Sequence, residues 1–212
     1  MSSRRRGEAR ARSAAAHDGS ALRWPGATAK FALFGEVLWV GVLCCVTGIA
    51  LVTLPAACAA GSAHLRRFLR AETSPPKKFF TDFLSALRTG WLVGVVSVLA
   101  VAILLVNIVI ASSRLLPGWQ FVLAGGVLVL ATFLVGLTGM TARWQDARSW
   151  RAAGRTWLHD ARTDPPGVLW LLVAVLLTVV AAWQLPPLVV PGIGCLVFAA
   201  LTTAVRERPQ RS

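Results

Sequence analysis

Polar side chains are scarce in the apolar part of this 212-residue chain, and they offer little chemistry. Glu36 is the only ionisable residue inside an apolar run, and a carboxylate within a membrane is by default a candidate functional group. Its place near the end of the run allows a structural alternative, in which it reaches lipid headgroups or pairs with Lys30. Asn107 is the second polar candidate, and an interhelical hydrogen bond explains it more simply than a bound substrate.

The histidines and cysteines form no recognisable metal-binding or catalytic set. No two histidines have ligand spacing, and no CxxC pair is present. HExxH, GxSxG and phosphate-loop motifs are absent too. We therefore predict no catalytic residue, no metal and no cofactor, and expect that the protein is not an enzyme. The residues considered are His17, His64, His159, Cys44, Cys45, Cys58 and Cys195.

Composition places the chain among integral membrane proteins. Hydrophobic residues make up 56% of the chain and charged residues 15%. Soluble domains have about 45–50% apolar and about 25% charged residues, so this chain has too little polar surface for a water-soluble globule. The apolar residues also fall in long runs, and most of the nine tryptophans lie near the ends of these runs, where indoles prefer the headgroup layer.

The net charge of +13 points to lipid rather than to nucleic acid. The basic residues lie between apolar runs, and no nucleic-acid recognition motif accompanies them. Anionic lipid headgroups are therefore the expected partner of the basic segments.

The apolar runs predict an all-α polytopic membrane protein. We expect a bundle of five full transmembrane helices, a short return or re-entrant helix, and two amphipathic interfacial helices. The full spans are expected at about 31–53, 91–111, 119–140, 168–184 and 188–205, the short helix at 55–65, and the interfacial helices at 79–90 and 144–161. Together they form a single domain, 31–205, between a disordered basic tail, 1–30, and a short tail, 206–212.

The first interfacial helix has a clear apolar face. Phe80 and Phe83 belong to this face at helical spacing, while Asp82, Ser85 and Arg88 lie opposite. Phe80 and Phe83 are therefore candidate structural or functional residues of the interface.

The distribution of basic residues predicts the topology. If 1–30, 61–90, 141–166 and 206–212 are cytoplasmic, 21 of the 22 basic residues lie inside. Both termini are then cytoplasmic, in the inner or plasma membrane. This assignment requires residues 31–65 to enter the membrane and return.

We predict that the return occurs at Thr53-Leu54-Pro55, because proline ends or kinks a helix. The return arm, 55–65, would span about 16 Å, which is short for a hydrocarbon core of about 30 Å. Thr53 and Pro55 are therefore candidate residues of a bend inside the membrane.

A family resemblance rests on three segments. They are the break Thr53-Leu54-Pro55-Ala56, the small residues 57–63 before Arg66-Arg67, and Phe79-Phe80-Thr81-Asp82-Phe83 ahead of four further spans. In this order the chain resembles the YesL-like bacterial membrane proteins, the domain of unknown function 624 family, over residues 31–205. One departure is that family members often carry an asparagine in the first span, where this chain has none.

The resemblance implies an association with carbohydrate uptake, because such proteins are often encoded beside components of sugar ABC transporters. It implies no established activity and no catalytic residues. The predicted function is accordingly a non-enzymatic accessory or regulatory membrane component, with ABC transporter subunits as partners. The alternative is a small multi-span transporter or channel that acts as an oligomer, with backbone groups freed near Pro55 as its ligand site.

Overall fold

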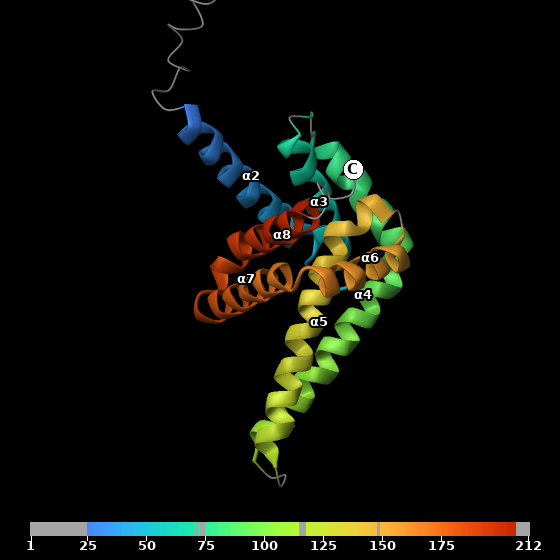
Figure 1. The fold of residues 1–212 in the computed structure, drawn as a ribbon, viewed down its shortest axis with the longest axis vertical. Coiled ribbons are helices and arrows are strands. Elements are labelled where there is room, and N and C mark those ends of the chain that lie inside the picture. Colours follow the sequence, from blue (N-terminus) through green and yellow to red (C-terminus); the bar gives the residue numbers. More distant parts are fainter. Residues whose placement is uncertain (1–24, 71, 73–74, 115–117, 148, 207–212) are drawn as a thin grey trace, which may run out of the picture. The chain divides into compact units, whose positions relative to one another are not determined.

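The computed structural model describes residues 25–70, 72, 75–114, 118–147 and 149–206, and all regular structure in these ranges is helical (Figure 1). The predicted all-α class is thus confirmed. The chain divides into two compact units, Met1–Glu36 and Val37–Ser212. The elements are α2 (Pro25–Thr47), α3 (Leu54–Leu69), α4 (Pro76–Ser112), α5 (Trp119–Ala147), α6 (Trp150–Thr163), α7 (Pro165–Gln184), the 3₁₀ turn η1 (Pro186–Leu188) and α8 (Val189–Arg206).

Four helical segments of the described chain are long and apolar enough to cross a membrane. They are Pro76–Ser112, Trp119–Ala147, Pro165–Gln184 and Pro186–Val205. A shorter apolar segment, Phe31–Thr47, belongs to α2. These lengths and compositions are those of a helical, multi-pass membrane protein.

The turn between α2 and α3 lies earlier in the chain than predicted. Helix α2 ends at Thr47, and Leu51 adopts a left-handed backbone with φ of 51° in the turn that follows. The Thr53 hydroxyl donates to the Thr47 carbonyl oxygen at 2.5 Å and closes this turn. Pro55 is in the first turn of α3, where its missing N–H has no intrahelical partner to lose. Proline therefore begins the return helix instead of breaking the outgoing one.

The ends of α2 and α3 also differ from the sequence-based expectation. Residues 25–30, assigned to a disordered tail, form the start of α2, while residues 1–24 and 207–212 lie outside the described chain. Helix α3 has 16 residues, about 24 Å, and so exceeds the predicted 55–65 at both ends.

Helix α3 is buried and packs along the first half of α4. Ala60 shares an apolar cluster with Phe79, and Ala56 shares another with Ala86. At the far end of this contact, a Cβ added to Gly94 would lie 1.9 Å from the Val52 carbonyl oxygen, so the α2–α3 turn touches the α4 backbone there. Small side chains permit such close helix approach. The turn therefore lies 18 residues, about 27 Å of helix, before the end of α4.

The predicted interfacial helix 79–90 and span 91–111 form one helix, α4, with a local distortion at Gly90. Gly90 has non-helical φ and ψ of −131° and 19°. The Trp150 indole N–H, from α6, donates to the Ala86 carbonyl oxygen at 3.1 Å. A Cβ at Gly90 would lie 1.9 Å from that indole nitrogen. The indole thus occupies the space that the glycine leaves open.

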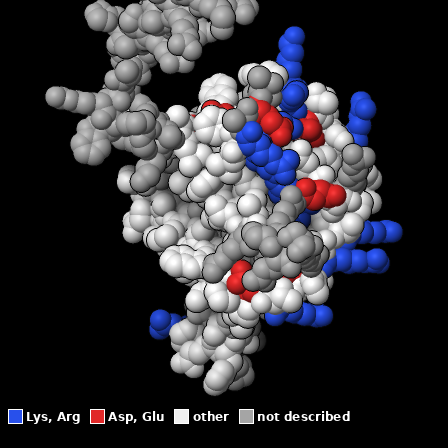
Figure 2. Space-filling view, turned by 45° about the horizontal axis from the view of Figure 1, so that its top comes forward, with Lys and Arg blue, Asp and Glu red and all other residues white. Residues whose placement is uncertain are grey.

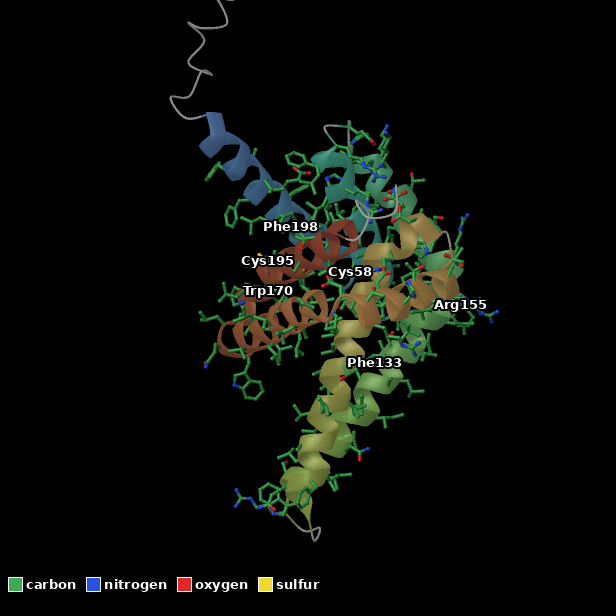
Figure 3. All side chains as sticks on the ribbon, viewed as in Figure 1. Cys58, Phe133, Arg155, Trp170, Cys195 and Phe198 are labelled. Carbon is green, nitrogen blue, oxygen red and sulfur yellow. The ribbon has the colours of Figure 1, made fainter. Side chains whose placement is uncertain are left out.

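The predicted helix 144–161 is divided between two elements. Residues 144–147 are the last turn of α5, and α6 begins at Trp150. The reason is a helix cap at Ser149, whose side-chain oxygen accepts from the Ala152 N–H at 3.2 Å. The amphipathic pattern is otherwise retained, since Trp157 is buried while Arg155 is exposed and points away from the neighbouring helices (Figure 3).

The α7–α8 pair packs on the second half of α5. Val135 and Ala142 of α5 form an apolar cluster with Leu171 of α7 and Ala200 of α8. Helix α4 pairs instead with α5 along the other side, and the α4–α5 and α7–α8 pairs run in different directions in Figure 1. Helix α7 starts at Pro165, slightly before the predicted residue 168, because Pro165 and Pro166 suit a first helical turn.

We expect Gly90→Ala to destabilise the fold by about 1–3 kcal/mol, because the new methyl group would overlap the Trp150 indole. The measurement is the free energy of unfolding in mixed detergent and SDS micelles, followed by circular dichroism. Gly125→Ala is the matched control, since nothing lies within 4 Å of its added Cβ. Equal stability of the two variants would contradict the packing of Trp150 against α4.

Candidate functional site

Charged side chains gather where α3 ends. Arg66 and Arg67 lie in the last turn of α3, and their carboxylate partners come from α5 and α4. Figure 2 shows acidic side chains lying among basic ones over part of the surface. The apolar helices thus carry their ionic contacts near one end.

Arg66 connects α3 to α5. Its side chain is only 6% exposed, and its Nη1 atom forms an ion pair with Asp146. Its Nη2 atom donates to the Ala142 carbonyl oxygen at 3.0 Å. A guanidinium buried to this degree is strongly destabilising unless it is paired, so these contacts fix the end of α3 against α5.

Two further ion pairs link neighbouring helices. Arg67 Nη2 lies 2.6 Å from Asp82 Oδ2 and joins α3 to α4, with side chains 12% and 25% exposed. Arg143 Nε lies 2.7 Å from Asp160 Oδ2 and joins α5 to α6, with side chains 4% and 9% exposed. The Arg143 guanidinium also lies 5.0 Å from the centre of the Trp157 ring, within the range of a cation–π contact.

A polar cavity of about 580 Å³ lies between α3, α4 and α5 beside these pairs. This volume is within the range of about 300–1,000 Å³ that is usual for small-molecule sites. The residues that line it are Arg66, Arg70, Asp82, Ser85, Thr89, Trp144, Gln145 and Asp146.

Three buried polar atoms of the cavity-lining residues have no hydrogen-bond partner among the described residues. They are the Arg66 Nε and Trp144 Nε1 donors and the Gln145 Oε1 acceptor. A buried donor or acceptor without a partner costs about 1–3 kcal/mol. These atoms are buried beneath the cavity surface. We call this space the polar cavity, because most of its lining side chains are charged or polar.

A second, smaller cavity of about 160 Å³ lies between α3, α5, α7 and α8. Pro55 and Cys58 line it from α3, and Cys58 lies among the packed helices in Figure 3. Its other lining residues come from the three longer helices and are mostly apolar, and we call it the apolar cavity.

The residues singled out in the sequence lie mostly apart from the polar cavity. Glu36 is half-buried on α2 in the first unit. Thr53 closes the α2–α3 turn, and Pro55 lines the apolar cavity. Phe80 is 46% exposed and meets Phe79 edge-on at 5.6 Å between ring centres.

Phe83 takes part in helix packing, and Asn107 bonds to its own helix. Phe83 packs against the clusters that hold Phe79 and Ala86, so it helps to join α4 to α3. Asn107 is exposed and donates from Nδ2 to the Ile103 carbonyl oxygen of its own helix at 3.3 Å. This hydrogen bond lies within α4, whereas the sequence favoured an interhelical one.

Sequence reasoning missed the residues of the polar cavity. In the sequence, Arg66 contributes to the charge distribution and to the family resemblance, and Trp144 is the first residue of the predicted interfacial helix 144–161. The available signal was the presence of Asp82, Asp146 and Asp160 in otherwise basic segments. Acidic residues in such segments indicate ion pairs across helices.

Within the described ranges, no three His, Cys, Asp or Glu residues come together as a metal site. The exposed lining of the polar cavity offers guanidinium, hydroxyl and carboxylate groups, from Arg70, Ser85 and Asp146, to a polar ligand.

Comparisons of the chain with protein-family models, with curated proteins and with solved structures gave no match. Functional inference therefore depends on the site itself and on the resemblance described above.

We expect Asp160→Asn to cost about 3–5 kcal/mol of unfolding free energy, because it leaves the buried Arg143 without its charge partner. Asp82→Asn, in the more exposed pair with Arg67, should cost about 1 kcal/mol or less. SDS titration of both variants measures the difference. A larger loss of unfolding free energy for Asp82→Asn than for Asp160→Asn would contradict the expectation that the more buried ion pair stabilises the fold more.

Proposed function

We propose that the protein is a non-enzymatic accessory or regulatory component of an uptake system in the bacterial inner membrane, with the polar cavity as its ligand-binding site. The observation that carries this proposal is the one-sided placement of polar groups. The three ion pairs between described residues and the polar cavity lie at the ends of α3 and α5, while the rest of the long helices is apolar.

This one-sided placement favours ligand binding at a membrane face over conduction. A path through the membrane needs polar groups at several depths. No charged residue lines the apolar cavity, and its polar side chains are limited to Cys58 and the three threonines Thr138, Thr141 and Thr178. The transporter or channel alternative is thus less well supported.

We further propose four crossing helices and a re-entrant α2–α3 hairpin, in place of five full spans. The described apolar part of α2 is short, and the α2–α3 turn lies beside Gly94 near the start of the apolar part of α4. A hairpin that enters and leaves on one side preserves the charge rule, since the basic segments before α2 and after α3 remain cytoplasmic. Both termini are then cytoplasmic.

The basic segment at the start of α4 fits a membrane surface. Lys77 and Lys78 are exposed, and Phe80 and Leu84 expose apolar side chains on the following turns. Cations beside apolar anchors are typical of segments that contact anionic headgroups.

The association with carbohydrate uptake rests on the resemblance to YesL-like proteins. We expect affinity purification from a strain that expresses this protein together with an ABC-type sugar importer to recover the importer's membrane subunits. A polytopic protein of similar size with the same tag is the control. Recovery of the protein alone under crosslinking conditions would overturn the proposed role.

A further inference from the structure

We propose that the apolar cavity holds the end of a hydrocarbon chain from a membrane lipid. This site goes beyond the proposed function, which depends on the polar cavity, and the two cavities share no lining residue. The ligand class follows from the chemistry of the cavity wall, from the cavity volume and from its depth along the apolar helices.

The accessible wall of the apolar cavity is apolar throughout. Thr138, Thr141 and Thr178 belong to the lining, and their hydroxyls donate to backbone carbonyl oxygens of their own helices at 2.8, 2.7 and 2.8 Å. A polar or charged ligand that entered this space would lose its hydrogen bonds to water and gain none in return. The wall therefore excludes polar and charged ligands and accepts hydrocarbon.

The volume of about 160 Å³ suits a short length of hydrocarbon. In another protein, an engineered apolar cavity of about 150 Å³ stays free of water and takes up benzene or xenon. The apolar cavity therefore accommodates a chain segment of about the size of benzene and is too small for a whole lipid. Without an occupant, its lining side chains lack dispersion contacts on one side.

The cavity lies near the middle of the apolar helices. Val175 follows Pro165, where α7 begins, by 10 residues, and Leu196 follows Pro186, where the last apolar segment begins, also by 10 residues. Ten residues correspond to about 15 Å of helix, which is half of a hydrocarbon core of about 30 Å. The headgroups of both leaflets are distant at this depth, so a lipid reaches the cavity only with the end of a chain.

A chain end in the cavity would fill a gap between α3 and α7. Along the described lengths of these two helices, no Cα atom of α3 lies within 8 Å of a Cα atom of α7. Pro55 and Cys58 of α3 and Val175 of α7 form a buried part of the lining, whereas Val179 of α7 is 51% exposed. The cavity thus has one side toward the surrounding lipid and a closed back wall.

The test is photocrosslinking of the full chain in nanodiscs that contain a phospholipid with a diazirine at the end of one acyl chain. Tandem mass spectrometry then locates the labelled residues. We expect labelling of Cys58, which is buried, lines the cavity and lies among the packed helices in Figure 3. Leu65, which is buried on the same helix but outside the lining, gives the background.

A second phospholipid, with the diazirine beside the carbonyl group of the chain, is the control for depth. It should label Cys58 about fivefold less than the first lipid, because its reactive group stays near the headgroups, about 15 Å from the middle of the hydrocarbon core.

Thr138→Leu tests the cavity itself, because the larger side chain occupies part of the space at the α5 wall. It should lower the labelling of Cys58 about fivefold, since less volume remains for the chain. Thr132→Leu is the matched control. Thr132 is exposed on α5 outside the lining, and both threonine hydroxyls donate within α5 at 2.8 Å. Cys195, which is exposed on α8, should be labelled equally in both variants.

Val179→Phe is a second cavity variant, and its position on the exposed side makes it less disturbing to the packed helices. The larger side chain narrows the cavity from α7 and should also lower the labelling of Cys58. Circular dichroism of each variant measures whether the helical fold is retained.

Each outcome supports or overturns the proposal. Labelling of Cys58 no higher than that of Leu65 would overturn it. Equal labelling of Cys58 by the two lipids would overturn it too, as would labelling that folded Thr138→Leu and Val179→Phe proteins leave unchanged. The importer co-purification does not involve this cavity, so the proposed function and the lipid site can fail separately.

Discussion

The structure depends on the position of Arg66 at the end of a buried helix. A guanidinium that is nearly inaccessible must keep its partners, and Arg66 finds them on α5 in Asp146 and the Ala142 carbonyl. The Ala-rich side of α3 packs meanwhile against α4. Helix α3 is therefore held to α5 by the contacts of Arg66, and to α4 by the two apolar clusters and the Arg67–Asp82 ion pair. The polar cavity is bordered by the same three helices.

The same arrangement separates polar from apolar chemistry along the helices. Arginine and aspartate pairs, the Ser149 cap and the Trp150 contact with Ala86 lie toward the charged end. Beyond Gly94, α4 exposes apolar side chains such as Leu99 and Ile103. A protein built in this way presents a lipid-compatible surface and one polar site, which is the basis of the proposed ligand-binding role.

Local signals in the sequence predicted much of the fold. Apolar runs located the long helices, although α4 and α7 begin at Pro76 and Pro165, earlier than the predicted residues 79 and 168. Errors arose where a distant residue decides the outcome. The backbone at Gly90 accommodates the Trp150 indole, which is 60 residues away in the chain. The Ser149 cap, by contrast, is a local signal that the sequence analysis missed. The polar cavity could not be predicted in the same way, because Arg66 and Asp146 are 80 residues apart and unpaired buried atoms appear only in three dimensions.

The most direct test of the account is thiol labelling at the α2–α3 turn in intact cells. In a background without native cysteines, Leu51→Cys, Ser85→Cys and Arg114→Cys are treated with a membrane-impermeant maleimide from outside the inner membrane. A re-entrant hairpin predicts that only the cysteine at 114 reacts from outside, and that the cysteine at 85 reacts only in inverted vesicles. Reaction of the cysteine at 51 from outside, at a rate like that at 114, would show that α2 crosses the membrane and would contradict the account.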